Sequence, residues 1–494
     1  MTTSSQSSQT KNVKTIAAIL LTGAFMAILN QTLLATALPH IMSDFGISAD
    51  LGQWVNSVFM LVNGVMIPVT AFLIEKFTTR RLFFTAMGLF ALGTLLCALA
   101  PTYAALIFGR IIQAAGAGIM MPLMQTVLLL VFPVERRGFA MGMVGLVIAF
   151  APAVGPTLSG YLIEHFHWSI LFWIIFPLSV LNIIVAYRVL KNVSFTRDPK
   201  LDIFSVILST LGFGGLLYGF SFAGTYGWAD PNVLLPMSLG LVTLGLFVWR
   251  QLILRQPILE VRVFKYGVFT TATIIGMIVF MSMIGSQTIL PIYMQDMNDF
   301  SALETGLMLL PGAVAMGLMS PITGRIFDKF GARKLAIFGL FIVCATTFMF
   351  TQLTTTTSFA YLATVNTFRM FGMAFVMMPV TTAAINSLPN VLIPHGTAMN
   401  NTARQVAGSI GTAALVTVMS SMALAPEQAP SMNEAMVHGV NMAFWLATIL
   451  TFIGFILSFF VPKGKGMPPD TIKESKAMSY TEEKKQNEAS RQRG

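Results

Sequence analysis

The sequence has few charged residues and almost no cysteine. Asp, Glu, Lys and Arg make up 10% of its 494 residues, against about 25% in an average soluble domain. The two cysteines, Cys97 and Cys344, stand singly inside apolar runs, which excludes a disulfide framework and a cysteine-rich metal site. Asp, Glu and His are absent from the middle of every apolar run, so no catalytic cluster is available. We therefore predict that the protein is not an enzyme and that it has no metal site.

Long apolar segments take up most of the chain. Hydrophobic residues account for 55% of it, and the mean hydropathy is +0.75. Fourteen apolar stretches can be counted, each of about 20 residues, and a helix of that length crosses a hydrocarbon layer of ~30 Å. The pattern predicts an all-α integral membrane protein with fourteen transmembrane helices.

The basic residues lie on one side of these predicted helices. If the N-terminus is cytoplasmic, the outer connections contain acids such as Asp44, Asp230 and Glu434 but no Lys or Arg. Because basic loops stay on the cytoplasmic side during membrane insertion, we predict a multi-pass membrane protein with both termini cytoplasmic. The net charge of +10 then reflects loops beside the lipid bilayer and not nucleic-acid binding.

Two segments repeat each other at a constant offset. Residues 68–82 read PVTAFLIEKFTTRRL and residues 321–335 read PITGRIFDKFGARKL, with six of fifteen positions identical. The repeat predicts two six-helix halves, and the offset leaves room for two helices between them. The predicted organisation is a cytoplasmic segment (1–14), a first six-helix bundle (15–190), two inserted helices (201–250), a second six-helix bundle (267–461) and a disordered cytoplasmic tail (462–494).

The repeated loop combines acids, glycines and bases. The residues concerned are Glu75, Arg80 and Arg81 in the first copy and Gly324, Asp328, Gly331 and Arg333 in the second. This order resembles the loop motif of the major facilitator superfamily. The resemblance implies a latch, in which charged residues bridge neighbouring helices in one conformation and release them in another. The first copy departs from the motif, with Thr78 in the place of Gly331.

The fifth apolar run carries a spaced series of small residues and prolines. Its motif residues are Gly142, Gly155, Pro156 and Gly160. They resemble the antiporter motif of drug exporters in that superfamily, although Ala151 and Ser159 replace two of its glycines. Small residues let helices approach closely, and the resemblance implies export as the direction of transport.

The first apolar run, with Thr32 and the ending Ala37-Leu38-Pro39, is similar to that of the fourteen-spanner drug:proton antiporters. Within that family the chain resembles lincomycin-resistance-type multidrug exporters, which implies a location in a bacterial plasma membrane. These proteins usually have an Asp where this chain has Asn30. An amide cannot take up and release a proton at working pH, so the departure removes an expected proton site.

Polar residues inside the apolar runs are the candidates for a substrate cavity. Arg110 resembles the intramembrane arginine of the family's fourth span, and Arg369 is its approximate counterpart in the second half. Arg404 lies near the start of its run, where we expect its side chain to extend towards the cytoplasmic surface. The predicted cavity residues are Asn30, Gln31, Arg110, Gln113, Gln125 and Gln287.

These observations favour a secondary exporter of amphipathic or hydrophobic small molecules that works by alternating access. The resemblance implies that protons are exchanged and that the proton gradient, not a cofactor, drives transport. Glu164 and Asp296 are the predicted proton carriers because both lie at outer helix ends, where partial burial would suit them to the task. A dedicated exporter of one native metabolite or lipid remains open. A membrane enzyme, a channel and a receptor are disfavoured.

Overall fold

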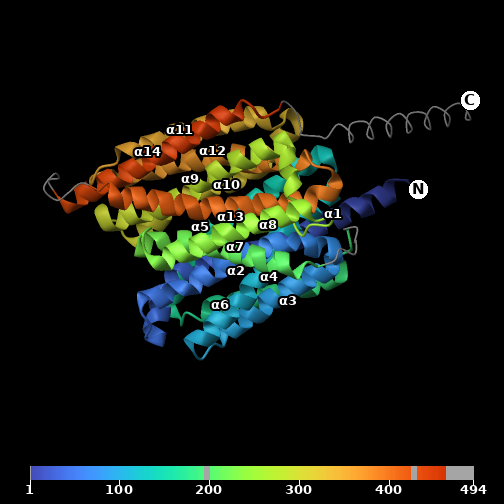
Figure 1. Cartoon of the computed structure of the whole chain (residues 1–494), viewed down its shortest axis with the longest axis horizontal. Helices are drawn as coiled ribbons and strands as arrows, with labels where there is room; N and C mark the ends of the chain where they lie inside the picture. The colour runs from blue at the N-terminus through green and yellow to red at the C-terminus, as the bar shows by residue number, and fades with distance from the viewer. Residues whose placement is uncertain (1, 194–200, 424–430, 463–494) are drawn as a thin grey trace, which may run out of the picture.

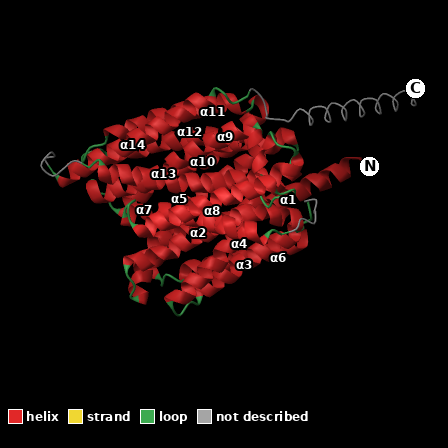
Figure 2. Ribbon diagram, in the orientation of Figure 1, coloured by secondary structure: helices red, strands yellow, loops and turns green. Residues whose placement is uncertain are grey.

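The computed structural model describes residues 2–193, 201–423 and 431–462 of the chain. Long helices run back and forth through the molecule, and no strand occurs among these residues (Figures 1 and 2). The predicted tail (462–494) lies outside the described residues except for its first position. The helices are α1 (Thr2–Phe45), α2 (Ala49–Lys76), α3 (Thr79–Ala98), α4 (Tyr103–Val131), α5 (Arg137–His165), α6 (Ile170–Val189), α7 (Ile203–Tyr226), α8 (Pro231–Ile253), α9 (Gly267–Ile292), α10 (Ala302–Phe330), α11 (Ala332–Met349), α12 (Phe359–Asn386), α13 (Ile393–Ser421) and α14 (Met432–Ser458).

Thirteen of the described helices are long and apolar enough to cross a membrane. The prediction of an all-α membrane fold is therefore confirmed. The remaining helix, α13, has 29 residues but carries many polar ones, among them Asn400, Asn401 and Arg404, which are buried. Its polarity faces the protein interior and not lipid, which is why α13 lacks the strong hydropathy of its neighbours.

Burial separates the central helices from the peripheral ones. In the apolar windows of α4 and α12, 78% and 83% of residues are buried, against 22% in α8. Helices α4 and α12 therefore lie at the centre of the bundle, and α8 presents most of its surface outward. The helices that follow the first half, α7 and α8, pack on each other, and α7 also packs on α2 and α13.

The two ends of the bundle differ in charge. We call the end at which α2 finishes and α3 begins the basic end, because its connections carry residues such as Arg80, Arg136 and Arg255. The N-terminus lies at this end (Figure 1). The opposite end, the acidic end, has Asp44 and Glu164 near its connections, and its described connections contain no Lys or Arg.

Helix starts and stops follow local chemistry. Ser301 caps α10 by accepting a hydrogen bond from the backbone N–H of Glu304, while the Glu304 carboxylate accepts one from the N–H of Ser301. At the other end of α10, Gly331 has φ +76°, a conformation that favours glycine, and the chain turns there directly into α11.

Candidate functional site

The two halves meet mainly along two helix pairs, α5 with α10 and α2 with α13, and also where α12 contacts α5 and α13 contacts α4. Closest approach occurs near the basic end, where a Cβ added to Gly324 would clash with the carbonyl oxygen of Gly138. Further along the same pair, Gly142 faces the backbone of Ser320. The glycines of α5 therefore let the backbones of opposite halves touch.

Asp328 joins the halves through the start of α5. One oxygen of its carboxylate accepts a hydrogen bond from the Gly138 N–H at 2.8 Å, and the other accepts one from the Phe139 N–H at 3.0 Å. A carboxylate at a helix N-terminus satisfies free N–H groups and is favoured by the helix dipole. Asp328, on α10, thus caps a helix of the opposite half, as the predicted latch requires.

Glu75 makes the equivalent contact from the first half. It is the repeat counterpart of Asp328, and its carboxylate lies 3.1 Å from Nε2 of His395 in the first turn of α13. The Glu75 and His395 side chains are only 15% and 6% exposed. Because Nδ1 of His395 accepts a hydrogen bond from the Glu260 N–H at 3.2 Å, the proton on a neutral ring is on Nε2 and is donated to Glu75.

The bases predicted for the latch do not cross between the halves. Arg80 donates to the Tyr187 carbonyl at 2.7 Å and so ties α3 to α6 within the first half. The side chains of Arg81 and Arg333 form no hydrogen bond or ion pair with a described residue. Arg80 therefore bridges two neighbouring helices as expected, although within one half, whereas Arg81 and Arg333 form no such bridge among the described residues.

Arg137 is a cross-half contact that the sequence motifs did not indicate. It is 6% exposed, and its guanidinium donates to Asn386 at 3.2 Å and to Asn390 at 3.3 Å. These two residues lie at the end of α12 and in the connection to α13. Arg137 precedes Gly138 in the first half, and His395 precedes the matching Gly396 in the second half. The two residues therefore occupy equivalent positions in the repeat.

Arg110 organises the interior of the first half. Its side chain is fully buried and donates to the Val55 carbonyl at 3.1 Å, to the Asn30 amide oxygen at 2.8 Å and to Gln113 at 2.7 Å. Gln113 in turn donates to Thr94 at 2.7 Å. Helices α1, α2, α3 and α4 are therefore joined through one guanidinium that does not reach solvent, and Asn30 offers it an oxygen without a charge.

Arg369 repeats this arrangement in the second half. It is fully buried on α12 and donates to Thr347 at 3.2 Å and to the Ser282 carbonyl at 2.7 Å. Thr347 stands 253 positions after Thr94, the offset of the repeated loops. The repeat thus extends into the membrane interior, with a buried arginine linked to a threonine of the preceding helix in each half.

Arg404 does not extend to the basic surface, contrary to the expectation from its position near the start of α13. Its side chain is buried, and the residue is 5% exposed. The guanidinium lies over the ring of Phe280 on α9, 4.8 Å from the ring centroid. No described residue accepts a hydrogen bond from it, and its Nε and Nη1 atoms are buried without a partner.

The predicted cavity amides are partly brought together. Gln125 on α4 accepts a hydrogen bond from Asn401 on α13 at 2.7 Å, which links the two halves. Asn30 and Gln113 belong to the Arg110 network. Gln31 and Gln287 are only partly buried, and their side chains make no hydrogen bond with a described residue.

The predicted antiporter motif covers two different contacts. Gly142 approaches α10 of the opposite half, whereas Gly155 lies against Thr32 of α1. Gly160 has open space beside it, so its predicted role in close packing is wrong. The helix runs unbroken through this region, and the side chain of Pro156 lies outside the described part of the structure.

Glu164 and Asp296 lie at the acidic end, as predicted, but both are exposed. The expected partial burial of these carboxylates is therefore wrong. Glu164 is in the last turn of α5, and Asp296 lies in the short π-helical turn Tyr293–Met297 after α9. The partly buried carboxylates of Glu75 and Asp328 lie instead at the basic end.

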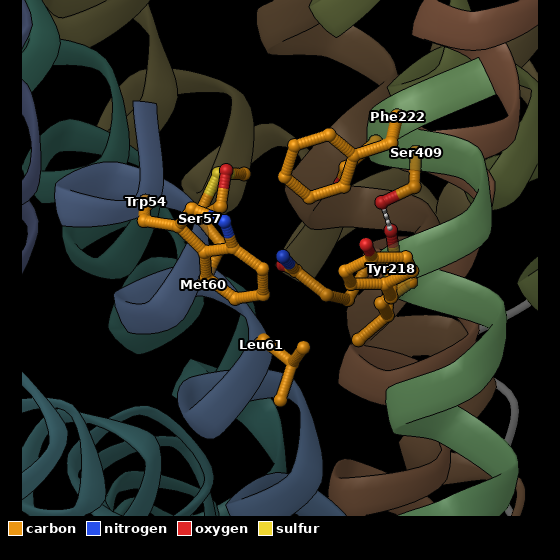
Figure 3. A pocket seen from close by; sticks show the side chains of 10 residues that line it. Trp54, Ser57, Met60, Leu61, Tyr218, Phe222 and Ser409 are labelled. Atoms are coloured by element: carbon orange, nitrogen blue, oxygen red, sulfur yellow. Dashed lines mark hydrogen bonds between the residues drawn. The ribbon is translucent and has the colours of Figure 1, made fainter. Parts of the chain in front are cut away.

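A small pocket lies between α2, α7 and α13 (Figure 3). Trp54 and the rings of Tyr218 and Phe222 surround one side, with centroids 4.7 to 5.6 Å apart. Gln405 and Ser409 of α13 form part of its lining. An outward-facing groove between α2, α7 and α8 shares Tyr218 with this pocket. Helix α7 therefore lies between an apolar groove on the outside and the polar residues Gln405 and Ser409 of α13.

Comparison with known proteins agrees with this architecture. The family model of the Major Facilitator Superfamily matches residues 20–412. The MFS-type transporter YcnB of Bacillus subtilis is 57% identical over 452 residues, covering 92% of this chain and 96% of YcnB. The lincomycin resistance protein LmrB of Listeria monocytogenes is 42% identical over 459 residues, covering 91% of this chain and 97% of LmrB. The solved structure of the human organic anion transporter MFSD10 shares the fold, with a TM-score of 0.67 at 14% identity over 90% of this chain and 99% of MFSD10.

Proposed function

The chain belongs to the major facilitator superfamily of membrane transporters, and from this premise we propose that it exports amphipathic small molecules from bacterial cells in exchange for protons. It is a bacterial multi-pass membrane protein. The observation that carries the proposal is its 42% identity, over nearly the whole of both chains, to a protein named for lincomycin resistance. Its interior of amides, aromatic rings and methionines suits amphipathic substrates of varied shape.

The contacts between the halves support alternating access. The hydrogen bonds and ion pairs described between them involve Gln125, Asp328, Glu75 and Arg137 with their partners, all from the basic end to about two turns inside it. The basic end is therefore closed by specific polar contacts. Transport requires these contacts to break while a second set forms at the acidic end.

We place the basic end and both termini in the cytoplasm, because Lys and Arg in short loops are retained on that side of the membrane. With this orientation the structure is closed towards the cytoplasm. Substrate would enter from the cytoplasm after the Asp328 and Glu75 contacts open, and would leave at the acidic end once they have formed again.

Proton exchange is proposed from the family resemblance, and the carriers proposed first are Glu164 and Asp296. Both are accessible from the acidic end, where an antiporter must take up protons. Asn30 cannot replace them, because its amide is neutral and bonded to Arg110.

Efflux from cells tests the function. Bacteria expressing the chain should retain less lincomycin and less of an amphipathic dye than cells with an empty vector, and an uncoupler should abolish the difference. Glu164→Gln with Asp296→Asn should remove substrate-induced proton release in vesicles. Efflux that persists with the uncoupler would exclude proton drive, and unchanged retention of every probe would exclude multidrug export.

A further inference from the structure

Four arginines of the described chain are buried, and Arg404 differs from the other three, Arg110, Arg137 and Arg369, each of which donates hydrogen bonds to the protein. Arg110 and Arg369 each donate hydrogen bonds to side chains and carbonyls of their own half. Arg404 is 5% exposed, and no described residue accepts a hydrogen bond from it. A buried charge without an opposite charge or acceptors destabilises the protein, so the presence of an arginine at this position calls for a physical reason.

No described acid neutralises this guanidinium. The four ion pairs among the described residues involve Asp44, Asp202, Glu260 and Glu75 with other partners. Glu75 contacts His395, nine residues before Arg404 on α13, which is about 13 Å along the helix axis. The packing of Arg404 on Phe280 fixes its position but leaves its N–H groups without acceptors.

The surroundings of Arg404 supply further hydrogen-bond donors. Gln125 of the opposite half is bonded through its oxygen to Asn401, one turn before Arg404, and its Nε2 group is buried without a partner. One unpartnered acceptor is nearby, the Oδ1 atom of Asn400, but an amide cannot balance a charge. Asn401 thus lies between two groups of opposite halves, Gln125, which it contacts, and Arg404, one turn further along α13, and each of these has a buried N–H group without an acceptor.

We propose that Arg404 binds an anionic group of the transported substrate, a carboxylate, sulfonate or phosphate, while Phe280 contacts the adjoining apolar part. The inference rests on the proposed function as an exporter and specifies its substrates as anionic amphiphiles. A guanidinium offers several N–H donors in a fixed plane and is suited to paired contacts with such oxyanions. Because Gln125 and Arg404 belong to different halves, the bound anion contacts both and can stabilise one state of the transport cycle.

Two probes with nearly the same aromatic body test the site. 8-Anilinonaphthalene-1-sulfonate carries the anionic group, and N-phenyl-1-naphthylamine lacks it. Both would be titrated by fluorescence against the full-length protein in lipid nanodiscs, with empty nanodiscs as background. Arg404→Gln should weaken binding of the sulfonate at least about tenfold and leave binding of the uncharged probe nearly unchanged. Arg404→Lys should retain part of the preference.

Controls separate binding from a structural role. Arg255→Gln removes an exposed arginine at the basic end and should bind both probes like the unaltered protein. Without ligand, Arg404→Met should have an unchanged or higher melting temperature, because it removes an uncompensated buried charge. A fall in melting temperature, equal loss of both probes in Arg404→Gln or full retention of the sulfonate would overturn the proposal. If the sulfonate binds as expected but vesicles transport neither probe, the site stands and the exporter function fails.

Discussion

At the scale of single residues, Arg110, Arg369 and Arg404 define the polar interior away from the helix ends. Two of them are built into their own half, and their pseudo-equivalent threonines, Thr94 and Thr347, show that the arrangement is duplicated. The unusual feature of the first half is that Arg110 faces the neutral Asn30, where the resemblance to drug:proton antiporters implies an acid. The charge of Arg110 is therefore met by uncharged acceptors and by the ring of Phe59, whose centroid is 4.2 Å away, and not by a carboxylate.

This arrangement predicts the effect of restoring the acid. Asn30→Asp would place a carboxylate about where the amide oxygen now lies, 2.8 Å from the Arg110 guanidinium. A charged pair at this buried site should stabilise the first half by about 1–3 kcal/mol. Thermal unfolding in detergent should show a higher melting temperature for Asn30→Asp and a lower one for Asn30→Ala. A decrease of similar size in both variants would show that Arg110 needs no counter-charge.

At the scale of helices, cross-half contacts gather at helix starts. Asp328 caps α5, and Glu75 meets the first turn of α13, so each half contributes one acid to a helix of the other. Gly331 and Gly324 permit the tight turn and the close helix approach that place Asp328 there. The residues beside these short loops thereby form the contacts between the halves that must break during transport.

Asp328→Asn should impair transport more than stability. The amide keeps one oxygen, so it loses one of two N–H contacts and the favourable charge at the α5 terminus, worth about 1–2 kcal/mol. Hydrogen exchange should accelerate in the first turn of α5, and efflux should fall. Glu304→Gln is the matched control, because Glu304 bonds the start of its own helix and should leave efflux intact. Equal efflux in both variants would contradict the latch.

Helices α7 and α8 are joined at the basic end by a different contact. Asp202 accepts hydrogen bonds from Arg250 at 2.6 and 3.0 Å. These bonds lower the pKa of the Asp202 carboxyl from its ordinary value of 3.8. A carboxyl whose pKa is lower in the folded state stabilises the fold above its unfolded-state pKa, and this contribution is lost as the pH falls through the folded-state pKa.

The pH dependence of stability should reveal this pair. At neutral pH, Asp202→Asn should have a lower melting temperature than the unaltered protein, and the difference should shrink as the pH falls below about 4. Asp230→Asn provides the comparison. Asp230 is the N-cap of α8 and forms no ion pair with a described arginine. A difference that is constant with pH would show that the carboxylate charge contributes nothing.

At the scale of the whole molecule, charge asymmetry orients the bundle. The basic end carries the arginines of the connections, and the described connections at the acidic end carry none. The same basic end holds the closed contacts between the halves. The orientation therefore determines how the conformation is described. If the basic end faces the cytoplasm, the structure is closed on the cytoplasmic side, and if it faces outward, the structure is closed on the outer side.

Cysteine labelling of intact cells checks the orientation. In a background with Cys97→Ala and Cys344→Ala, single substitutions at exposed acidic-end positions, Asn232→Cys or Ser431→Cys, should react with an impermeant thiol reagent. Substitutions at exposed basic-end positions, Asn192→Cys or Gln256→Cys, should react only after the membrane is permeabilised. Reaction of Asn192→Cys in intact cells would invert the proposed topology.

The amino-acid sequence by itself determined the class of fold, the repeat and the family. These follow from hydropathy and from the positions of charges and glycines along the chain, which are local properties that a bilayer reads directly. The acids Glu75 and Asp328, which the same reasoning singled out, do contact the opposite half, but their role as a latch stays a prediction. The predicted boundaries of the bundles and the roles of the cavity residues stay predictions.

Only the tertiary structure decided which polar groups meet. Sequence position suggested that Arg404 reaches the surface and that Glu164 and Asp296 are partly buried, whereas the structure buries the first and exposes the other two. The sequence also did not indicate that Arg137 and His395 contact the opposite half. A side chain's surroundings depend on the rotation of its helix and on which helix of the other half packs against it, and neither is encoded in hydropathy or local spacing.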